Sequence, residues 1–281
     1  MVRTMHMKKK TIYTIISYSL LTIIALIFLV PIVWMAGTSL KLPQEVFSVP
    51  PSVVGDTLQW GNYTRAWAAM PFNRFLFNSM FVGIASTFVT VLGSAMAAYA
   101  FARIPFRGRE ALFLLYIATL MIPVQVTVVP LFIIMRDFGW IDTYQAMILP
   151  VSFTAFGTFL IRQFFLTIPF DFEDSARIDG AGRLTLFLRI MMPLGKSALV
   201  TLSIFHFVTQ WKNFLWPLIV VNRTSMMTIP LGLDRFQGQF GTQWHLLMAA
   251  TTLGVLPGLI LFLFLQKQLA DGIAMSGLGG R

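Results

Sequence analysis

The stretch Pro169-Phe-Asp-Phe-Glu-Asp-Ser-Ala-Arg-Ile-Asp-Gly180, continued by Ala181 to Pro193, interrupts a chain that is otherwise mostly apolar. Five basic residues lie in or beside it: Arg162, Arg177, Arg183, Arg189 and Lys196. Cytoplasmic loops of membrane proteins carry an excess of Lys and Arg, so this segment is predicted to be cytoplasmic. We therefore expect a folded, charged segment attached to membrane-spanning helices.

The composition indicates a polytopic membrane protein. Hydrophobic residues make up 57% of the 281 residues and charged residues only 11%, which is far from a soluble domain. A charge at the bilayer centre costs about 2.5–3.5 kcal/mol, and roughly 20 apolar residues cross the hydrocarbon core. Windows without charges, one of them broken by Lys212, predict a single all-α domain over residues 1–281 with six transmembrane helices, near residues 12–36, 75–101, 111–135, 143–162, 197–221 and 245–266.

The basic residues also predict the orientation. With both termini inside, 14 Lys and Arg residues fall in the inner segments and 6 in the outer ones, while Lys212 lies within a span. This asymmetry favours both termini in the cytoplasm. It also explains the net charge of +10 by topology and contact with an anionic inner leaflet, so a nucleic-acid partner is not expected.

Residues 169–193 are predicted to form a helix, a turn and a second helix. Asp171 is the expected N-cap, Gly180 the expected stop, and Arg177 can pair with Glu173 or Asp174. A second, amphipathic helix is expected to end before Pro193, because proline disfavours helical geometry in the preceding residue. Such a helix could lie on the lipid surface or dock into a groove on a partner, and the pattern alone leaves both open.

The sequence of this charged segment resembles that of a known protein family. Asp174-Ser-Ala-Arg-Ile-Asp-Gly180, with Pro193 thirteen residues later, is similar to the coupling motif of ATP-binding-cassette importer permeases. The surrounding sequence resembles the carbohydrate-uptake branch, in particular the shorter of its two permease subunits, as in maltose, glycerol-3-phosphate and alginate importers. The resemblance extends over nearly the whole chain, including Ala97 to Arg103, Phe159 to Phe165 and Trp211 to Pro217. Asp174 and Ser175 replace the usual Glu and Ala, and Lys212 interrupts the usual Trp-Asn pair.

The resemblance implies a permease subunit of an ATP-driven, binding-protein-dependent saccharide importer in the bacterial inner membrane. Its expected partners are a second permease, two cytoplasmic ATPases that bind ATP and Mg, and an extracytoplasmic solute-binding protein. The chain itself is expected to be non-catalytic and to bind no cofactor, since its sequence has no Gly-x-x-x-x-Gly-Lys-Ser/Thr loop and nucleotide chemistry must come from a partner. No metal is expected either, because neither His206 nor His245 has a second ligand at helical ligand spacing. The residues expected to couple to the ATPases are Glu173, Asp174, Ser175, Ala176, Arg177, Asp179, Gly180, Ala181 and Pro193.

The fifth span holds the expected solute contacts. Trp211, Lys212, Asn213 and Trp216 combine aromatic faces and an amide, which suit sugar rings, with a cation that suits an acidic oligosaccharide such as alginate. The alternative for Lys212 is an interface position or an ion pair with the partner permease, since intramembrane charges need such surroundings. The rival function is a stand-alone secondary transporter or channel. An integral-membrane enzyme is a third possibility. The spans contain no recognised catalytic motif, which argues against it.

Overall fold

The computed structural model describes residues 2–239 and 243–278, and the regular structure in these ranges is helical. The contacts divide the chain into two units, residues 1–70 with 235–253, and residues 71–234 with 254–281. Three helices are long and apolar enough to cross a membrane, and the count reaches six if each of three bent helix pairs is one span. The all-α prediction is therefore confirmed, and six spans agree with these lengths.

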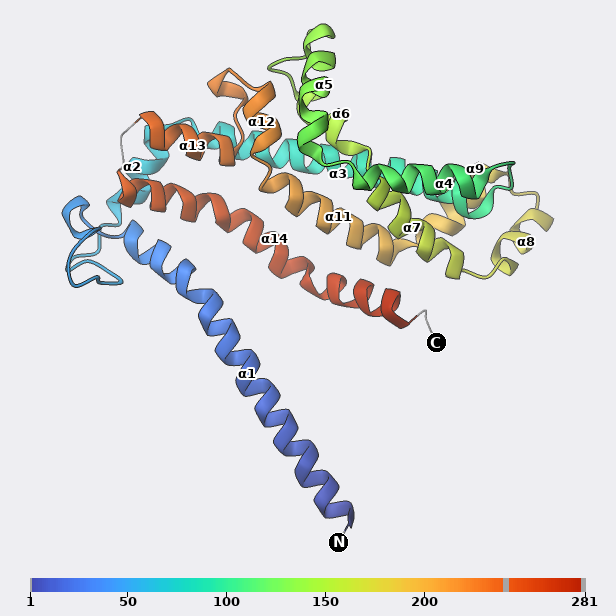
Figure 1. Ribbon diagram of the computed structural model, residues 1–281, viewed down its shortest axis with the longest axis horizontal. Coiled ribbons are helices and arrows are strands. Elements are labelled where there is room, and N and C mark those ends of the chain that lie inside the picture. Colours follow the sequence, from blue (N-terminus) through green and yellow to red (C-terminus); the bar gives the residue numbers. More distant parts are fainter. Residues whose placement is uncertain (1, 240–242, 279–281) are drawn as a thin grey trace. The chain divides into compact units, whose positions relative to one another are not determined.

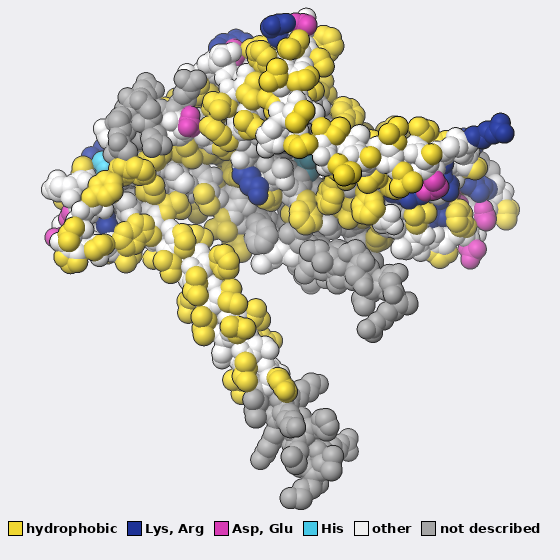
Figure 2. All heavy atoms as spheres, in the orientation of Figure 1, with side chains coloured by type: hydrophobic (Ala, Val, Ile, Leu, Met, Phe, Trp, Pro, Cys, Tyr) yellow, Lys and Arg dark blue, Asp and Glu magenta, His cyan; other side chains and the backbone are white. Residues whose placement is uncertain are grey.

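The first unit contains the long helix α1 (Val2–Ser39), the turn η1 (Pro43–Glu45) and α2 (Gly61–Ala69). Hydrophobic side chains cover much of α1 where its side chains are described (Figure 2), and only 6% of its candidate span is buried within the protein. Such a surface is stable only against lipid or another subunit. At the end of α1, the Asn62 side chain donates hydrogen bonds to the carbonyls of Ser39 (2.8 Å) and Lys41 (2.9 Å) and so satisfies groups that a helix end leaves free.

The second unit is organised around α3 (Phe72–Arg103), which packs against α6 (Tyr144–Ser152), α7 (Ala155–Thr167) and α11 (Lys196–Trp211) (Figure 1). Small residues on α3 allow close approach: a Cβ on Gly83 would lie 2.8 Å from the Phe207 ring of α11. The core cluster joins Ala98 of α3, Phe165 of α7 and Leu202 of α11. Tight packing of small residues is the usual contact between helices in lipid.

The predicted third and fourth spans are each bent pairs of helices. The third comprises α4 (Arg109–Ala118), the short η2 (Thr119–Met121) and α5 (Val124–Asp137), with a bend of 98°. Ile122 and Pro123 are extended at this bend, as expected for a proline and the residue before it. The fourth comprises α6 and α7, bent by 47° between Ser152 and Ala155.

The charged segment contains α8 (Asp171–Ile178), α9 (Arg183–Leu186), a π-helical turn η3 (Phe187–Met191) and α10 (Met192–Leu194). The expectation that Pro193 would keep Met192 out of helical geometry is wrong, because Met192 has φ −63° and ψ −48°. Pro193 lies in the first turn of α10, where a missing N–H breaks no helical bond. The chain bends by 76° around Gly195 into α11; a Cβ on Gly195 would lie 2.6 Å from the Phe165 ring.

The predicted fifth span is not one continuous helix. α11 ends at Trp211, and α12 (Leu215–Val220) follows a short break. The chain continues through η4 (Thr224–Met226), α13 (Ile229–Gln239) and α14 (Trp244–Leu278), the last of which includes the sixth predicted span.

Asp142 joins the α5–α6 turn to the end of α12. Its carboxylate accepts hydrogen bonds from the backbone N–H groups of Asn222 (2.6 Å) and Arg223 (2.8 Å). Burial alone would raise the pKa of Asp142, but these N–H groups and the nearby Arg223 guanidinium lower it below its usual range. Asp142 has φ +62°, a left-handed conformation that Asp tolerates better than most residues.

Candidate functional site

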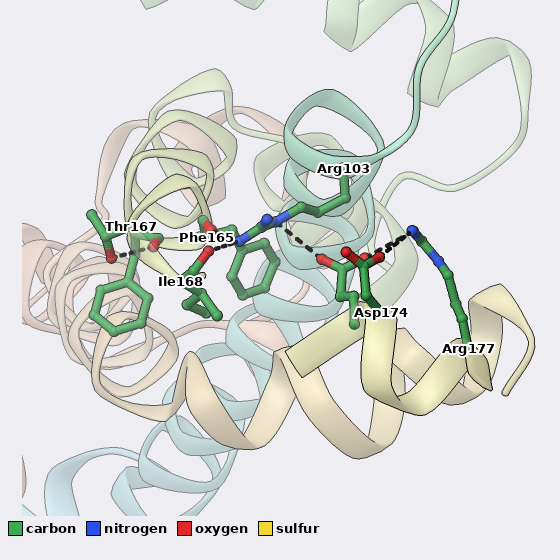
Figure 3. Close-up of polar contacts among 8 residues, drawn as sticks. Arg103, Phe165, Thr167, Ile168, Asp174 and Arg177 are labelled. Carbon is green, nitrogen blue, oxygen red and sulfur yellow. Dashed lines mark hydrogen bonds and ion pairs between the residues drawn. The ribbon is translucent and has the colours of Figure 1, made fainter. Parts of the chain in front are cut away.

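A buried ion pair attaches α8 to the end of α3. Arg103 Nε lies 3.2 Å from Glu173 Oε1, and the two side chains are 1% and 0% exposed. Glu173 is in the first turn of α8, whereas Arg103 is in the last turn of α3, seventy residues earlier. Figure 3 shows the Arg103 side chain reaching toward α8. A charge pair this deeply buried fixes the position of α8, because separating it would leave two uncompensated charges.

Arg103 also closes the end of α7. Its Nη2 donates to the carbonyls of Phe165 and Ile168 at the end of this helix (Figure 3). The guanidinium lies over the Phe170 ring, 4.3 Å from its centre. One side chain therefore joins α3, the end of α7 and α8.

The turn after α8 has the predicted geometry. Gly180 has φ +83°, its N–H bonds to the Arg177 carbonyl (3.0 Å), and the N–H of Ala181 bonds to the Ala176 carbonyl (2.9 Å). This is the hydrogen-bond pattern of a Schellman motif with glycine in the left-handed position. Arg177 pairs with Asp174 (3.0 Å) and Glu173 (3.3 Å), and both predicted pairs are confirmed.

The expectation that Asp171 caps α8 is wrong. The residue at the cap position is Phe170, in right-handed helical geometry and without a side-chain cap bond, and Asp171 is the first residue of the helix. The N–H groups of Glu173 and Asp174 instead bond to the Phe170 carbonyl (2.8 and 3.0 Å). Asp171 still places a carboxylate in the first turn, where it complements the helix dipole.

Glu173 is buried against the rest of the second unit, and most of the predicted coupling residues are not. Asp174, Ser175, Arg177, Asp179, Gly180 and Pro193 are exposed, and Ala176 and Ala181 are half-buried. Large apolar side chains accompany them on the surface: Ile178 is 88% exposed and Leu184 is 70% exposed. The expected single stripe on the second helix is divided, since Phe187 and Met191 are buried while Leu184 and Leu188 are exposed. The π-helical turn changes the helical register at this point.

A second arginine, Arg162 of α7, supports the same end of the unit. Its Nη2 contacts both carboxylate oxygens of Glu110 on α4 at 2.8 and 2.9 Å. The guanidinium also lies 4.0 Å from the centre of the Phe113 ring. Arg162 therefore joins α7 to α4, much as Arg103 joins α3 to α8.

The predicted solute-pathway residues occupy the break between α11 and α12. Lys212 is exposed and ends α11, where the negative end of the helix dipole favours a cation. The Asn213 side chain donates to the Gln210 side chain (2.9 Å) and accepts from the backbone N–H of Trp216 (3.4 Å).

The two tryptophans of this set are packed to different extents. Trp211 stacks on Phe207 and lies beside Gly258 of α14, where a Cβ would come within 2.9 Å of its Nε1. The ring of Trp216 is buried, and its N–H donates to the Ala146 carbonyl (2.7 Å). These contacts favour a packing role for Trp216, and its contact with solute stays a prediction.

Comparison with known proteins identifies the family. Residues 89–275 match the family described as binding-protein-dependent transport system inner membrane component. The chain belongs to this family. The matched range contains the end of α3, the charged segment and the break between α11 and α12. The predicted resemblance to importer permeases is thereby confirmed.

Several permeases are similar over most of their length. The chain is 33% identical to the arabinooligosaccharides transport system permease protein AraQ of Bacillus subtilis, over 98% of this chain and 99% of the relative. It is 34% identical to the sulfoquinovosyl glycerol transport system permease protein SmoH of Agrobacterium fabrum (90% and 89% covered). It is also 34% identical to the sn-glycerol-3-phosphate transport system permease protein UgpE of Yersinia enterocolitica (83% and 85% covered).

A solved structure has the same fold. A chain of a bacterial ABC transporter involved in the import of the acidic polysaccharide alginate matches with a TM-score of 0.80 and 23% identity, covering 91% of this chain and 96% of that one. At this identity the match shows the fold of the permease and leaves its solute to other evidence.

The roles of two arginines in this permease are not evident from the sequence. Arg103 and Arg162 are recognisable there as basic residues of the inner segments and as parts of stretches that resemble the family, and neither has its acidic partner within helical reach along the chain. The sequence offers two signals for the buried pair. Arg103 is a charge just after a predicted span, and Glu173 is a second acidic residue directly before Asp174 of the coupling motif.

Proposed function

We propose that this permease forms half of the translocation pathway of an ATP-driven saccharide importer and couples it to cytoplasmic ATPases through residues 169–193. The observation that carries the proposal is the two-sided structure of α8. Glu173 is held on Arg103 in the interior, while Ile178 at the end of α8 and Leu184 at the start of α9 expose apolar surface on either side of the Gly180 turn. A rigidly held element with an exposed apolar tip is suited to transmit the movement of a docked partner.

The proposed assembly contains this permease, a second homologous permease, two ATPases that bind ATP and Mg, and an extracytoplasmic binding protein. This chain is the non-catalytic membrane subunit, with both termini in the cytoplasm of a bacterium and six spans in its inner membrane. The family description supports dependence on a binding protein. The charge asymmetry supports the orientation, and the absence of a phosphate-binding loop from the sequence supports separate ATPases.

The proposed solute is a saccharide or a sugar derivative, with an acidic oligosaccharide as the specific form of the proposal. The names of the relatives support the class, because they include an oligosaccharide, a glycosyl glycerol and a glycerol phosphate. Exposed Lys212 beside Trp211 supports the acidic form, since an exposed ammonium group can bind a carboxylate.

Reconstitution tests the proposal against a stand-alone carrier or channel. Liposomes containing only this permease are expected to show neither uptake nor ATP hydrolysis. Liposomes containing the four-subunit complex, supplied with the binding protein, are expected to take up solute only with ATP inside. Uptake by this chain alone, or uptake that a protonophore abolishes while ATP is present, would support the rival.

The docking part of the proposal has its own test. In the complex, Ile178→Glu places a charge on the exposed tip of the segment and is expected to release the ATPases during purification. Val49→Glu, at an apolar position that is 93% exposed and lies outside the predicted spans, is the control for a general effect of an added charge. Retention of the ATPases by Ile178→Glu would contradict docking through this tip.

A further inference from the structure

A cavity of about 630 Å³ lies between the end of α3, the following turn and the α8–α9 turn. Four arginines line it: Arg103, Arg109, Arg177 and Arg183, together with Tyr99. All of them belong to the second unit. We call it the Arg103 cavity. Figure 2 shows Lys and Arg side chains gathered at the end of this unit that carries α8 and α9.

The charge of this cavity is unbalanced. Its lining, as far as the described residues show, includes no Asp or Glu. Glu173 and Asp174 face Arg103 and Arg177 from α8, and Glu110 is shared by Arg109 and Arg162. Arg183 has no ion pair within the described residues. The guanidinium groups therefore outnumber the carboxylates that can neutralise them.

Buried hydrogen-bond donors are also left over. The Arg103 side chain is 1% exposed, and its Nη1 and Nε make no hydrogen bond within the described part of the chain. Nε still has the Glu173 charge at 3.2 Å, but Nη1 has no acceptor among the described residues. A buried polar group normally has a partner, because leaving it without one costs the loss of its hydration. An acceptor in the cavity would satisfy this donor.

We propose that the Arg103 cavity binds a phosphate-type anion, supplied by an anionic phospholipid headgroup or by a free phosphorylated small molecule. Guanidinium groups match phosphate oxygens with two parallel hydrogen bonds, and several of them can surround one phosphate. The volume of the cavity lies in the range of small-ligand sites and is larger than one carboxylate side chain would fill. The cavity is at the end of the protein that the basic residues assign to the anionic inner leaflet.

The bound anion adds a link between the end of α3 and the residues that follow α8. Arg103 comes before the coupling segment, and Arg183 follows its Gly180 turn. A phosphate held by both guanidiniums restrains the turn between them. Binding is therefore expected to protect the backbone amides of residues 178–186 from hydrogen exchange, while the amides at the distant α5–α6 turn exchange as before.

The test uses the full chain in nanodiscs. The first probe is inorganic phosphate, titrated into phosphatidylcholine nanodiscs and followed by calorimetry; the second is phosphatidylglycerol, whose retention is measured by native mass spectrometry. Arg183→Gln is expected to weaken binding roughly ten- to a hundredfold, the effect of one lost charge-assisted hydrogen bond. Arg189→Gln is the matched control, because this exposed arginine in the same segment does not line the cavity.

The outcomes separate the sources of the anion and can overturn the proposal. Saturable phosphate binding that falls in Arg183→Gln supports a free phosphorylated ligand, and selective loss of phosphatidylglycerol from the same variant supports a lipid headgroup. No binding of either probe, or equal losses in both variants, would overturn the proposal. Binding that vanishes when the ATPases assemble would also overturn it, since the cavity would then be a socket for an acidic partner side chain.

Discussion

Arg103 Nε and Glu173 Oε1 lie 3.2 Å apart in the interior of the second unit, with 1% and 0% of their side chains exposed. The neighbouring pair between Arg177 and Asp174 has similar geometry, but its side chains are 49% and 60% exposed. The two acidic residues are adjacent in the sequence and belong to the same helix. Their burial therefore gives them different roles: Glu173 attaches α8 to the interior, and Asp174 lies on the exposed surface of the proposed coupling segment.

Replacing Glu173 by Gln is expected to destabilise the permease by about 3–5 kcal/mol, because the buried Arg103 would lose its counter-charge. The measurement is the thermal unfolding midpoint of the purified chain in detergent. Asp174→Asn is the control and is expected to change stability by less than about 1 kcal/mol, as an exposed pair does. Similar shifts in the two variants would contradict the structural role of the buried pair.

Gly180→Ala is expected to cost about 1–2 kcal/mol and to reduce ATP-driven uptake. The cost comes from the backbone alone, because φ is +83° while nothing lies within 4 Å of the added Cβ. Gly182→Ala adds the same methyl group in equally open space at φ −76° and is expected to be nearly neutral. Unfolding and uptake are measured for both variants; equal behaviour would show that the turn does not need a left-handed residue.

Asp142 makes part of the stability dependent on pH. Its carboxylate has a pKa below the usual 3.8, so its bonds to Asn222 and Arg223 contribute fully above that value and are lost as the pH falls through the lowered pKa. Asp142→Asn is expected to destabilise the protein by about 1 kcal/mol at pH 7. The difference from the unmodified protein should shrink below about pH 3.8.

Unfolding of the two proteins across pH 3–7 checks this prediction. Asp137→Asn, at an exposed carboxylate of the same region, provides the control and is expected to show little difference at any pH. A gap between Asp142→Asn and the unmodified protein that stays constant down to the lowest pH would mean that the ionised carboxylate is not the source of the effect.

Lys212→Asn is expected to reduce transport of an acidic oligosaccharide by roughly ten- to a hundredfold at limiting solute, which is the effect of one charge-assisted hydrogen bond. Transport of the neutral counterpart should be little changed. Competition uptake in the reconstituted complex compares the two solutes. If both respond equally, Lys212 supports the helix break, and a neutral saccharide becomes the better assignment.

The sequence by itself determined the class of the protein, its all-helical spans and the place of the coupling motif. These properties follow from the local sequence. A segment of about 20 apolar residues favours the bilayer whatever surrounds it in the fold. A glycine after a charged helical turn can adopt the left-handed conformation that ends the helix. The pairing of Arg177 with Glu173 and Asp174 was predictable for the same reason, because three or four residues along a helix fix the distance between side chains.

Only the tertiary structure decided which acidic residue is buried, where the spans bend and how α8 is held. Arg103 meets Glu173 seventy residues away because α3, α7 and the π-helical turn pack together, and no local pattern encodes that arrangement. Pro193 remains helical although the rule for prolines predicts a break, since it occupies the first turn of a new short helix. Packing of distant side chains chooses among conformations that local preference alone leaves nearly equal in free energy.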